Sequence, residues 1–249
     1  FSELFSIISI YKLFLYFRPE LVHMLTIKPI LYAGLVVRLF KYLSPRITVA
    51  SITGLGSSSM DNSFFGKLLW WGLTLFYRFS LSSNHVKVIF ENPDDRKLFL
   101  KKRIVLIEDS FLVNGAGVDI KEFYPSTKKS KLVTVILVAR LLKDKGIREF
   151  IEAGRILKEL KVRVELLLIG SVDTNNASSM RQDDISLADK MGYIKFLGHR
   201  TDIAKCYQRA HIACLPSYRE GLPKSLIEAA ACGLAIVTTD VPGCRQMVV

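Results

Sequence analysis

The fold is decided by residues 217–233, which read Ser-Tyr-Arg-Glu-Gly-Leu-Pro-Lys-Ser-Leu-Ile-Glu-Ala-Ala-Ala-Cys-Gly. Pro223 suits the first position of a helix, where its missing N–H costs nothing. The residues from Lys224 to Cys232 are rich in helix formers, and Gly233 is a typical stop. The stretch therefore predicts a short helix that begins directly after a Gly-Leu-Pro turn and carries one carboxylate before its start and another inside it.

The start of this predicted helix suits an anionic ligand, because unpaired N–H groups and the positive end of the helix dipole meet there. Glu228, one turn further in, can accept hydrogen bonds from ribose hydroxyls, while Glu220 faces whatever the phosphate carries. We therefore predict a nucleotide-sugar pocket whose donor-binding residues include Gly221, Leu222, Pro223 and Ser225. The alternative is a solvated helix start with no ligand.

Glu220 and Glu228, separated by seven residues and followed by small residues and a glycine, resemble the signature of the glycosyltransferase 4 family. A second element similar to this family is Val-Ala-Arg-Leu-Leu-Lys-Asp-Lys-Gly at residues 138–146. The resemblance implies a GT-B fold that retains anomeric configuration, with the donor held by the C-terminal domain. It also implies that Arg140 and Lys145 reach the donor diphosphate from the end of a strand, although each could belong to an ordinary loop.

The composition describes a chain able to bury a large core, because half of its 249 residues are hydrophobic. A net charge of +12, spread over both halves, favours an anionic partner such as a bilayer surface or a diphosphate. Nucleic acid is not expected, because the basic residues form no known binding motif. The four cysteines lack the close paired spacings of zinc or redox sites and suit the reduced thiols of a cytoplasmic protein.

Helical and strand patterns alternate along the chain and predict parallel sheets with crossovers, in two doubly wound α/β units. Residues 1–125 form the expected acceptor-side Rossmann-like domain, and residues 126–131 the linker. Residues 132–249 form the expected donor-binding domain, with the ligand cleft between the two. Because the chain starts at Phe1, with no first strand and glycine-rich loop before it, and lacks the closing helices, we expect both domains to be incomplete and this chain alone to be inactive.

The N-terminal half carries its own resemblance, to a subgroup that adds sugars to polyprenyl-diphosphate-linked glycans for capsule, O-antigen or protein glycosylation. The residues that carry it are Thr26-Ile27-Lys28-Pro29, Ile52-Thr53-Gly54-Leu55-Gly56, Phe90 to Asp95 and Asn114 to Asp119. Gly54 and Gly56 would let the backbone approach a ligand, or could form an ordinary turn. Thr53 stands where many relatives have a histidine, so a histidine contact to the donor sugar is not expected.

Residues 68–77, Leu-Leu-Trp-Trp-Gly-Leu-Thr-Leu-Phe-Tyr, are flanked by Lys67 and Arg78. The stretch is too short to span a bilayer, which needs about 20 apolar residues. Paired tryptophans with basic flanks suit a helix lying in the interface of an anionic membrane, and a helix packed in the core is the alternative. The interfacial interpretation predicts a peripheral protein at the inner face of the cytoplasmic membrane.

These features together predict a retaining transferase that moves a sugar from a nucleotide diphosphate sugar, a UDP-sugar, to a lipid-linked glycan. Arg140 and Lys145 would stabilise the leaving diphosphate and Glu220 would orient the sugar. No metal cofactor is expected, because Asp94-Asp95 and Asp183-Asp184 lack an Asp-x-Asp pattern. The rivals are a nucleotide- or membrane-binding fragment without turnover, and another Rossmann-type enzyme, which would need a Gly-x-Gly-x-x-Gly turn.

Overall fold

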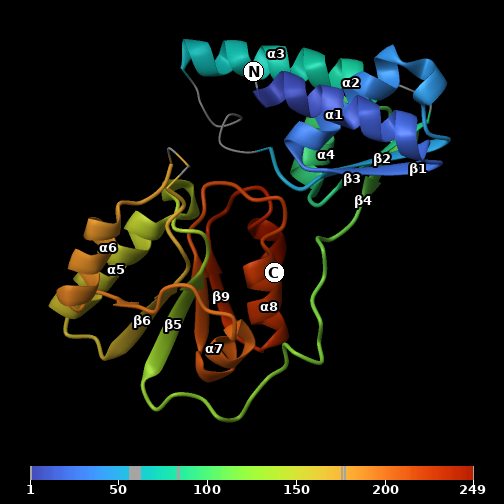
Figure 1. Ribbon diagram of the computed structural model, residues 1–249. Coiled ribbons are helices and arrows are strands. Elements are labelled where there is room, and N and C mark those ends of the chain that lie inside the picture. The colour runs from blue at the N-terminus through green and yellow to red at the C-terminus, as the bar shows by residue number, and fades with distance from the viewer. Residues whose placement is uncertain (1, 56–62, 83–84, 175, 177, 249) are drawn as a thin grey trace. The chain divides into compact units, whose positions relative to one another are not determined.

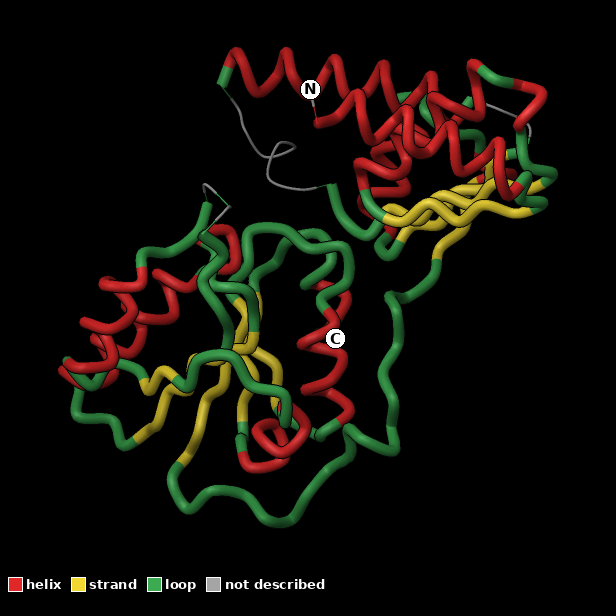
Figure 2. The backbone as a smooth tube through the Cα atoms, in the orientation of Figure 1, coloured by secondary structure: helices red, strands yellow, loops and turns green. Residues whose placement is uncertain are grey.

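The computed structural model describes residues 2–55, 63–82, 85–174, 176 and 178–248. The chain divides into two compact units, Phe1–Gly115 with Glu220–Leu222 and Ala116–Arg219 with Pro223–Val249. Each unit contains a parallel sheet with helices packed on it (Figure 1, Figure 2). The alternation predicted from the sequence is therefore confirmed, and with it the α/β class.

The first unit has a four-stranded sheet in the order β1-β2-β3-β4, with every pairing parallel. Its strands are β1 (Leu21–Leu25), β2 (Ile47–Ile52), β3 (Val86–Phe90) and β4 (Ser110–Leu112). Its helices are α1 (Ser2–Phe17), α2 (Ile27–Leu39), α3 (Phe64–Leu81) and α4 (Pro93–Lys101). Its core joins the sheet to the helices, as when Tyr77 of α3 and Phe90 of β3 both pack against Phe99 of α4.

The second unit has a five-stranded parallel sheet in the order β7-β6-β5-β8-β9. Its strands are β5 (Val133–Val138), β6 (Val164–Ile169), β7 (Lys195–Phe196), β8 (Ile212–Leu215) and β9 (Ala235–Thr238). Its helices are α5 (Ile147–Glu159), α6 (Gln182–Lys190), α7 (Ile203–Arg209) and α8 (Lys224–Ala231).

The sheet of the second unit is buried on both faces, because successive side chains of a strand point to opposite sides. Ile136 of β5 packs in the core beneath α7 and α8, and its neighbour Leu137 packs in the core beneath α5 and α6. Figure 1 shows the two helix pairs on opposite sides of this sheet. This is the doubly wound arrangement that places the loops after the strands at one edge.

Two details differ from the sequence prediction. The short strand β4 lies at Ser110–Leu112, which the sequence analysis does not assign to a strand, and Ile104 is buried between α4 and β4 in the chain. The units meet at Gly115 and Ala116, ahead of the polar linker expected at residues 126–131. The reason is that Phe123 packs in the core of the second unit, so the chain joins that unit before the polar stretch begins.

Candidate donor-binding site

The site is built around the first turn of α8, which begins at Lys224 after the loop that follows β8. Pro223 is the N-cap residue rather than the first helical residue, a shift of one position from the sequence prediction. The N–H groups of Leu226 and Ile227 both donate to the carbonyl of Pro223. The N–H groups ahead of them, at Lys224 and Ser225, have no partner within the helix, as at any helix start. They offer the donors that a phosphate group would accept.

Glu228 lies one turn into α8 with its side chain 12% exposed. Burial raises the pKa of this carboxyl, and the ammonium of Lys224, 3.5 Å from Oε1, acts in the opposite direction. A partly buried carboxylate with a single nearby cation keeps acceptor capacity for other donors. Glu228 can therefore accept hydrogen bonds from a pair of hydroxyl groups, as the sequence analysis predicts.

The loop after β5 carries Arg140 and Lys145. Arg140 is exposed and lies 3.9 Å from the carboxylate of Asp173, which follows β6. Lys145 is partly buried and closes a 3₁₀ turn, Lys143–Lys145, that ends at Gly146 in the left-handed conformation (φ 72°). Two cations thus stand at the carboxyl end of the sheet in the same unit as α8.

Glycine is required where the loops at this edge pack together. A Cβ at Gly146 would lie 2.1 Å from the carbonyl oxygen of Pro216, and one at Gly170 would lie 1.9 Å from that of Ala139. Neither separation is possible for real atoms, so only glycine lets the loops after β5, β6 and β8 approach this closely. The Lys145 turn and the approach to α8 are therefore packed backbone against backbone.

Ser217 fixes this contact further. It is fully buried, and its hydroxyl donates to the carbonyl oxygens of Asp144 (3.0 Å) and Arg219 (3.3 Å). The N–H of Tyr218 donates to the same Asp144 oxygen at 2.9 Å, and the hydroxyl of Thr239 donates to the Ser217 carbonyl. Sequence reasoning missed Ser217, since a serine in a polar loop gives no signal of burial.

A buried tyrosine of α7 forms a hydrogen bond to the backbone of α8. Tyr207 of α7 is 1% exposed, and its hydroxyl donates to the carbonyl of Ser225 at 2.9 Å. That bond joins the first turn of α8 to α7. Tyr207 was also missed, because an aromatic residue in a short amphipathic helix is typical of a core.

The predicted site residues fall in both units. Arg140, Lys145, Pro223, Ser225 and Glu228 belong to the second unit, and the structure brings them to one edge of its sheet. The remaining predicted residues are grouped with the first unit and are Thr53, Gly54, Glu220, Gly221 and Leu222.

Within the first unit, Gly54 has φ 125°, which agrees with the conformational freedom predicted for it. Gly56 lies outside the described residues. In the part of the chain that the structure describes, no group of three or more His, Cys, Asp or Glu side chains could hold a metal ion. The four cysteines are all free thiols.

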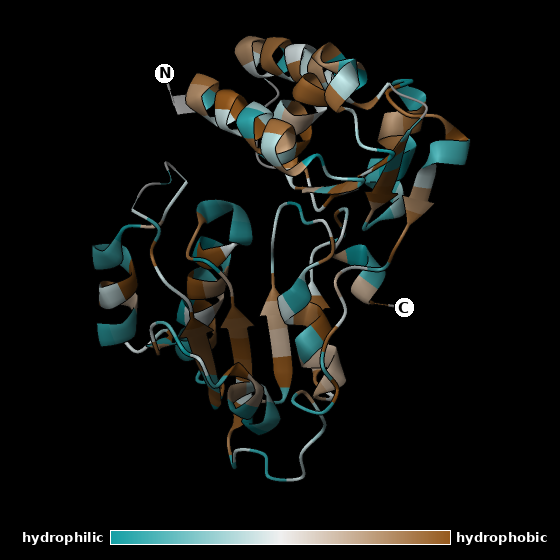
Figure 3. Cartoon of the chain, turned by 45° about the vertical axis from the view of Figure 1, so that its right-hand side comes forward, coloured by the Kyte–Doolittle hydropathy of each residue, from teal (hydrophilic) through white to brown (hydrophobic). Residues whose placement is uncertain are grey.

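Helix α3 carries a second candidate surface. Its exposed apolar side chains include Phe65 (79%), Leu68 (53%) and Trp71 (61%), while its neighbour Trp70 packs against the core. A shallow apolar groove lies over Gly72, and Figure 3 shows hydrophobic colour along the helices of this unit. Trp70 therefore fits the alternative of a core-packed helix, whereas Trp71 is exposed, and the membrane interface stays a prediction. Among the described helices, none is long and apolar enough to cross a bilayer.

Comparison with known families now identifies the chain. Residues 119–249 match the family model described as glycosyl transferases group 1, and the chain belongs to this family. The parallel α/β architecture matches solved glycosyltransferases of the GT-B class.

Two curated relatives share sequence with most of the chain. An N,N'-diacetylbacillosaminyl-diphospho-undecaprenol alpha-1,3-N-acetylgalactosaminyltransferase of Campylobacter jejuni is 32% identical over 80% of this chain and 54% of its own length. A UDP-Gal:alpha-D-GlcNAc-diphosphoundecaprenol alpha-1,3-galactosyltransferase of Escherichia coli is 24% identical over 97% of this chain and 63% of its own length. The chain thus spans between about half and two thirds of the length of these two relatives.

Among solved structures, the HepE protein of Anabaena in complex with UDP and glucose superposes with a TM-score of 0.72 at 18% identity. The match covers 96% of this chain and 65% of HepE. At this identity the similarity shows a shared fold.

Proposed function

We propose that this chain is the nucleotide-sugar-binding and sugar-transferring part of a retaining glycosyltransferase of family 4. The donor is a UDP-sugar and the acceptor a polyprenyl-diphosphate-linked glycan used for a capsule, a lipopolysaccharide or another surface polysaccharide. The observation that carries the proposal is the meeting, at one sheet edge, of the α8 start, the Glu228 carboxylate and the Arg140 and Lys145 cations. The names of the two undecaprenol-specific relatives and of the UDP complex support the choice of acceptor and donor.

In this proposal the diphosphate rests on the first turn of α8, and Glu228 accepts hydrogen bonds from ribose. Glu220 orients the sugar. The bond between the anomeric carbon and the diphosphate oxygen breaks while the acceptor hydroxyl attacks from the same face, and its proton passes to the leaving phosphate. Arg140 and Lys145 stabilise the negative charge that grows on the diphosphate, which lowers the barrier because that charge is largest in the transition state. The two cations take the place of a divalent metal, so no metal cofactor is required.

We also propose that the protein works at an anionic membrane surface, at the inner face of the cytoplasmic membrane. The apolar side chains of α3, with Lys67 and Arg78 exposed on the same helix, support an interfacial position for this helix. The net charge of +12 supports attraction to anionic lipid rather than to a neutral bilayer. No nucleic-acid partner is proposed.

The test is radiolabelled transfer by the full reading frame, from a panel of UDP- and GDP-sugars to a polyprenyl-diphosphate-linked acceptor, with and without EDTA. We expect transfer from one UDP-sugar, undiminished by EDTA, with the anomeric configuration of the product retained in its NMR spectrum. Binding of UDP without transfer or hydrolysis of any donor would favour the rival function, a nucleotide- or membrane-binding fragment. Inversion of configuration, or complete loss of transfer in EDTA, would contradict the mechanism.

A further inference from the structure

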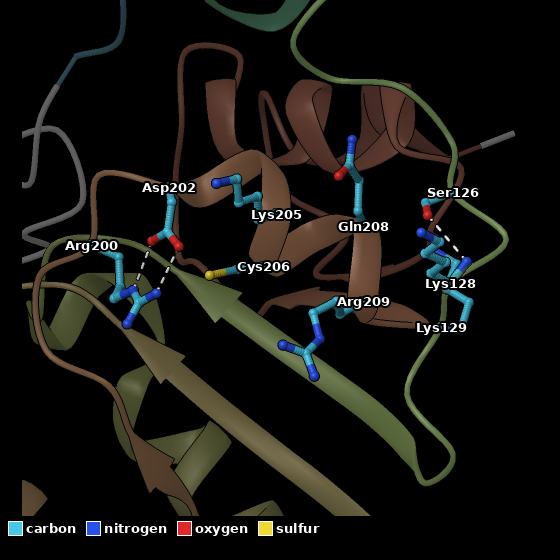
Figure 4. Close-up of a pocket in the computed structure, with 9 residues that line it drawn as sticks. All are labelled: Ser126, Lys128, Lys129, Arg200, Asp202, Lys205, Cys206, Gln208 and Arg209. Atoms are coloured by element: carbon cyan, nitrogen blue, oxygen red, sulfur yellow. Dashed lines mark hydrogen bonds and ion pairs between the residues drawn. The ribbon is translucent and has the colours of Figure 1, made fainter.

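A cationic groove lies between residues 126–129 and helix α7, entirely within the second unit (Figure 4). Its volume is about 560 Å³. The charged side chains that line it are Lys128, Lys129, Arg200, Asp202, Lys205 and Arg209. Five of these six are cations, so an empty groove concentrates positive charge on a small concave surface.

The one carboxylate among these lining residues is that of Asp202, and it neutralises only the cation that it is paired with. Both oxygens of Asp202 accept hydrogen bonds from the Arg200 guanidinium, at 2.8 and 2.7 Å. Lys205 and Arg209 lie one turn apart on α7, where like charges repel. Within the described residues, the side chains of Lys128, Lys129, Lys205 and Arg209 form no ion pair.

Lys129 is the most informative of these residues. Its ammonium nitrogen is shielded from solvent and has no hydrogen-bond partner among the residues that the structure describes. A buried ammonium is costly unless an anion or acceptors satisfy it. In Figure 4 its side chain lies on the wall of the groove formed by residues 126–129, beside Lys128.

The two walls are tied to each other by the backbone. The N–H of Ser130, directly after Lys129, donates to the carbonyl of Arg209 at 3.0 Å. The backbone segments that carry the lysines of one wall and the cations of α7 are therefore held next to each other, which favours a preformed site. The volume is typical of small-molecule pockets and exceeds what one inorganic phosphate would fill.

We propose that this groove is a binding site for a phosphate-bearing anion, held by Lys128 on one wall and by Lys205 and Arg209 on the other, with the solvent-shielded charge of Lys129 adding to the attraction. Phosphate is favoured over a simple carboxylate because its several oxygens can accept from both walls at once. The ligand is either a soluble phosphate compound or the headgroup of an anionic phospholipid. The site is separate from the start of α8 and does not rest on the proposed sugar transfer.

The test is calorimetric titration of the chain with inorganic pyrophosphate, in a Lys145→Ala background that weakens binding at the start of α8. We expect Lys129→Met, which keeps the aliphatic stem but removes a solvent-shielded charge beside the groove, to weaken pyrophosphate binding about tenfold. The double variant Lys205→Glu/Arg209→Glu should abolish it. Lys190→Glu, an exposed charge reversal on α6 across the sheet, is the matched control and should leave the affinity within about twofold.

Vesicles distinguish the two sources of phosphate. If the double variant also lowers sedimentation with phosphatidylcholine–phosphatidylglycerol vesicles, and pyrophosphate competes with them, the ligand is a lipid headgroup. If it loses pyrophosphate while vesicle binding is unchanged, the ligand is a soluble phosphate compound. Equal pyrophosphate affinity in the parent, Lys129→Met and double-variant chains, all with unchanged thermal unfolding, would overturn the proposal.

Discussion

Helices α3 and α5 each cover a sheet, yet they present opposite surfaces to solvent. The exposed side of α5 carries Arg155, which is paired with Glu152 and with Glu159 on successive turns. The exposed side of α3 carries Phe65 and Trp71 instead. Because a solvated helix needs no apolar outer face, the difference supports the proposed interfacial position of α3, which α5 has no feature to share.

The same contrast separates the two units in their candidate roles. In the second unit, polar groups are fixed by short backbone contacts around Lys145 and the start of α8. In the first unit, the unusual feature is apolar surface on α3 that none of the described residues covers. We expect the first arrangement to act in chemistry and the second in attachment, so a variant should be able to impair one without the other.

The largest expected effect that tests the separate roles of the two units is on the rate of sugar transfer. Lys145→Ala should lower the rate of sugar transfer about 100-fold, because it removes a charge that stabilises the departing diphosphate. Vesicle binding should not change. Lys143→Ala is the matched control, since Lys143 lies on the same 3₁₀ turn but is exposed. Equal transfer rates in the two variants would contradict the role given to Lys145.

The next effect is on vesicle binding. Replacing Leu68 and Trp71 by serine should lower binding to anionic vesicles about tenfold while thermal unfolding is unchanged, because both side chains are already exposed. Trp70→Ser should instead lower the free energy of unfolding by about 2 kcal/mol, because Trp70 packs against the core. Ile156→Ser, at an exposed position of α5, is the control. Unchanged vesicle sedimentation in the Leu68 and Trp71 double variant would remove the distinction between the helices.

The sequence predicts the alternation of strands and helices because each buried strand and each amphipathic helix leaves a local pattern. It also predicts the place of Glu228, since helix formers between Pro223 and Gly233 define where α8 runs. The sequence cannot predict that Trp70 packs against the core while Trp71 is exposed. Helix α3 is apolar on most sides, so only its packing in the fold decides which side chains are buried. Ser217 and Lys129 are missed for a related reason: burial of a polar side chain depends on neighbours distant in the sequence.

A smaller effect tests whether the packing of the loops in the second unit contributes to ligand binding or to folding alone. Ser217→Ala removes a buried hydroxyl that donates to Asp144 and should cost about 1 kcal/mol of stability. It should also reduce UDP affinity, because the Lys145 turn is then less firmly held. Ser80→Ala is a matched control in the first unit, where a buried serine hydroxyl donates to the Leu31 carbonyl at 3.2 Å. If both variants lose similar stability and neither loses UDP affinity, Ser217 serves folding alone.

The smallest effect concerns pH and the Glu228 carboxyl, whose pKa is raised by burial. Ribose hydroxyls donate only weakly to a protonated carboxyl, so UDP affinity should fall on acidification, and at a higher pH than an ordinary glutamate would give. Because the folded state holds this proton more tightly than the unfolded state, stability should decrease as pH rises from the ordinary glutamate range through the raised pKa, and then level off.

Two variants make this prediction specific. Glu228→Gln should remove both pH dependences, weakening UDP binding while sparing the protein the cost of a buried charge at neutral pH. Lys224→Met removes the nearby ammonium that opposes burial, so it should move the loss of UDP affinity to still higher pH. Calorimetric titration of UDP across the acidic range measures the first dependence, and thermal unfolding in the same buffers measures the second. A UDP affinity that varies with pH identically in the parent chain and in Glu228→Gln would show that another group carries the dependence, and that the charge of Glu228 does not act on the ligand.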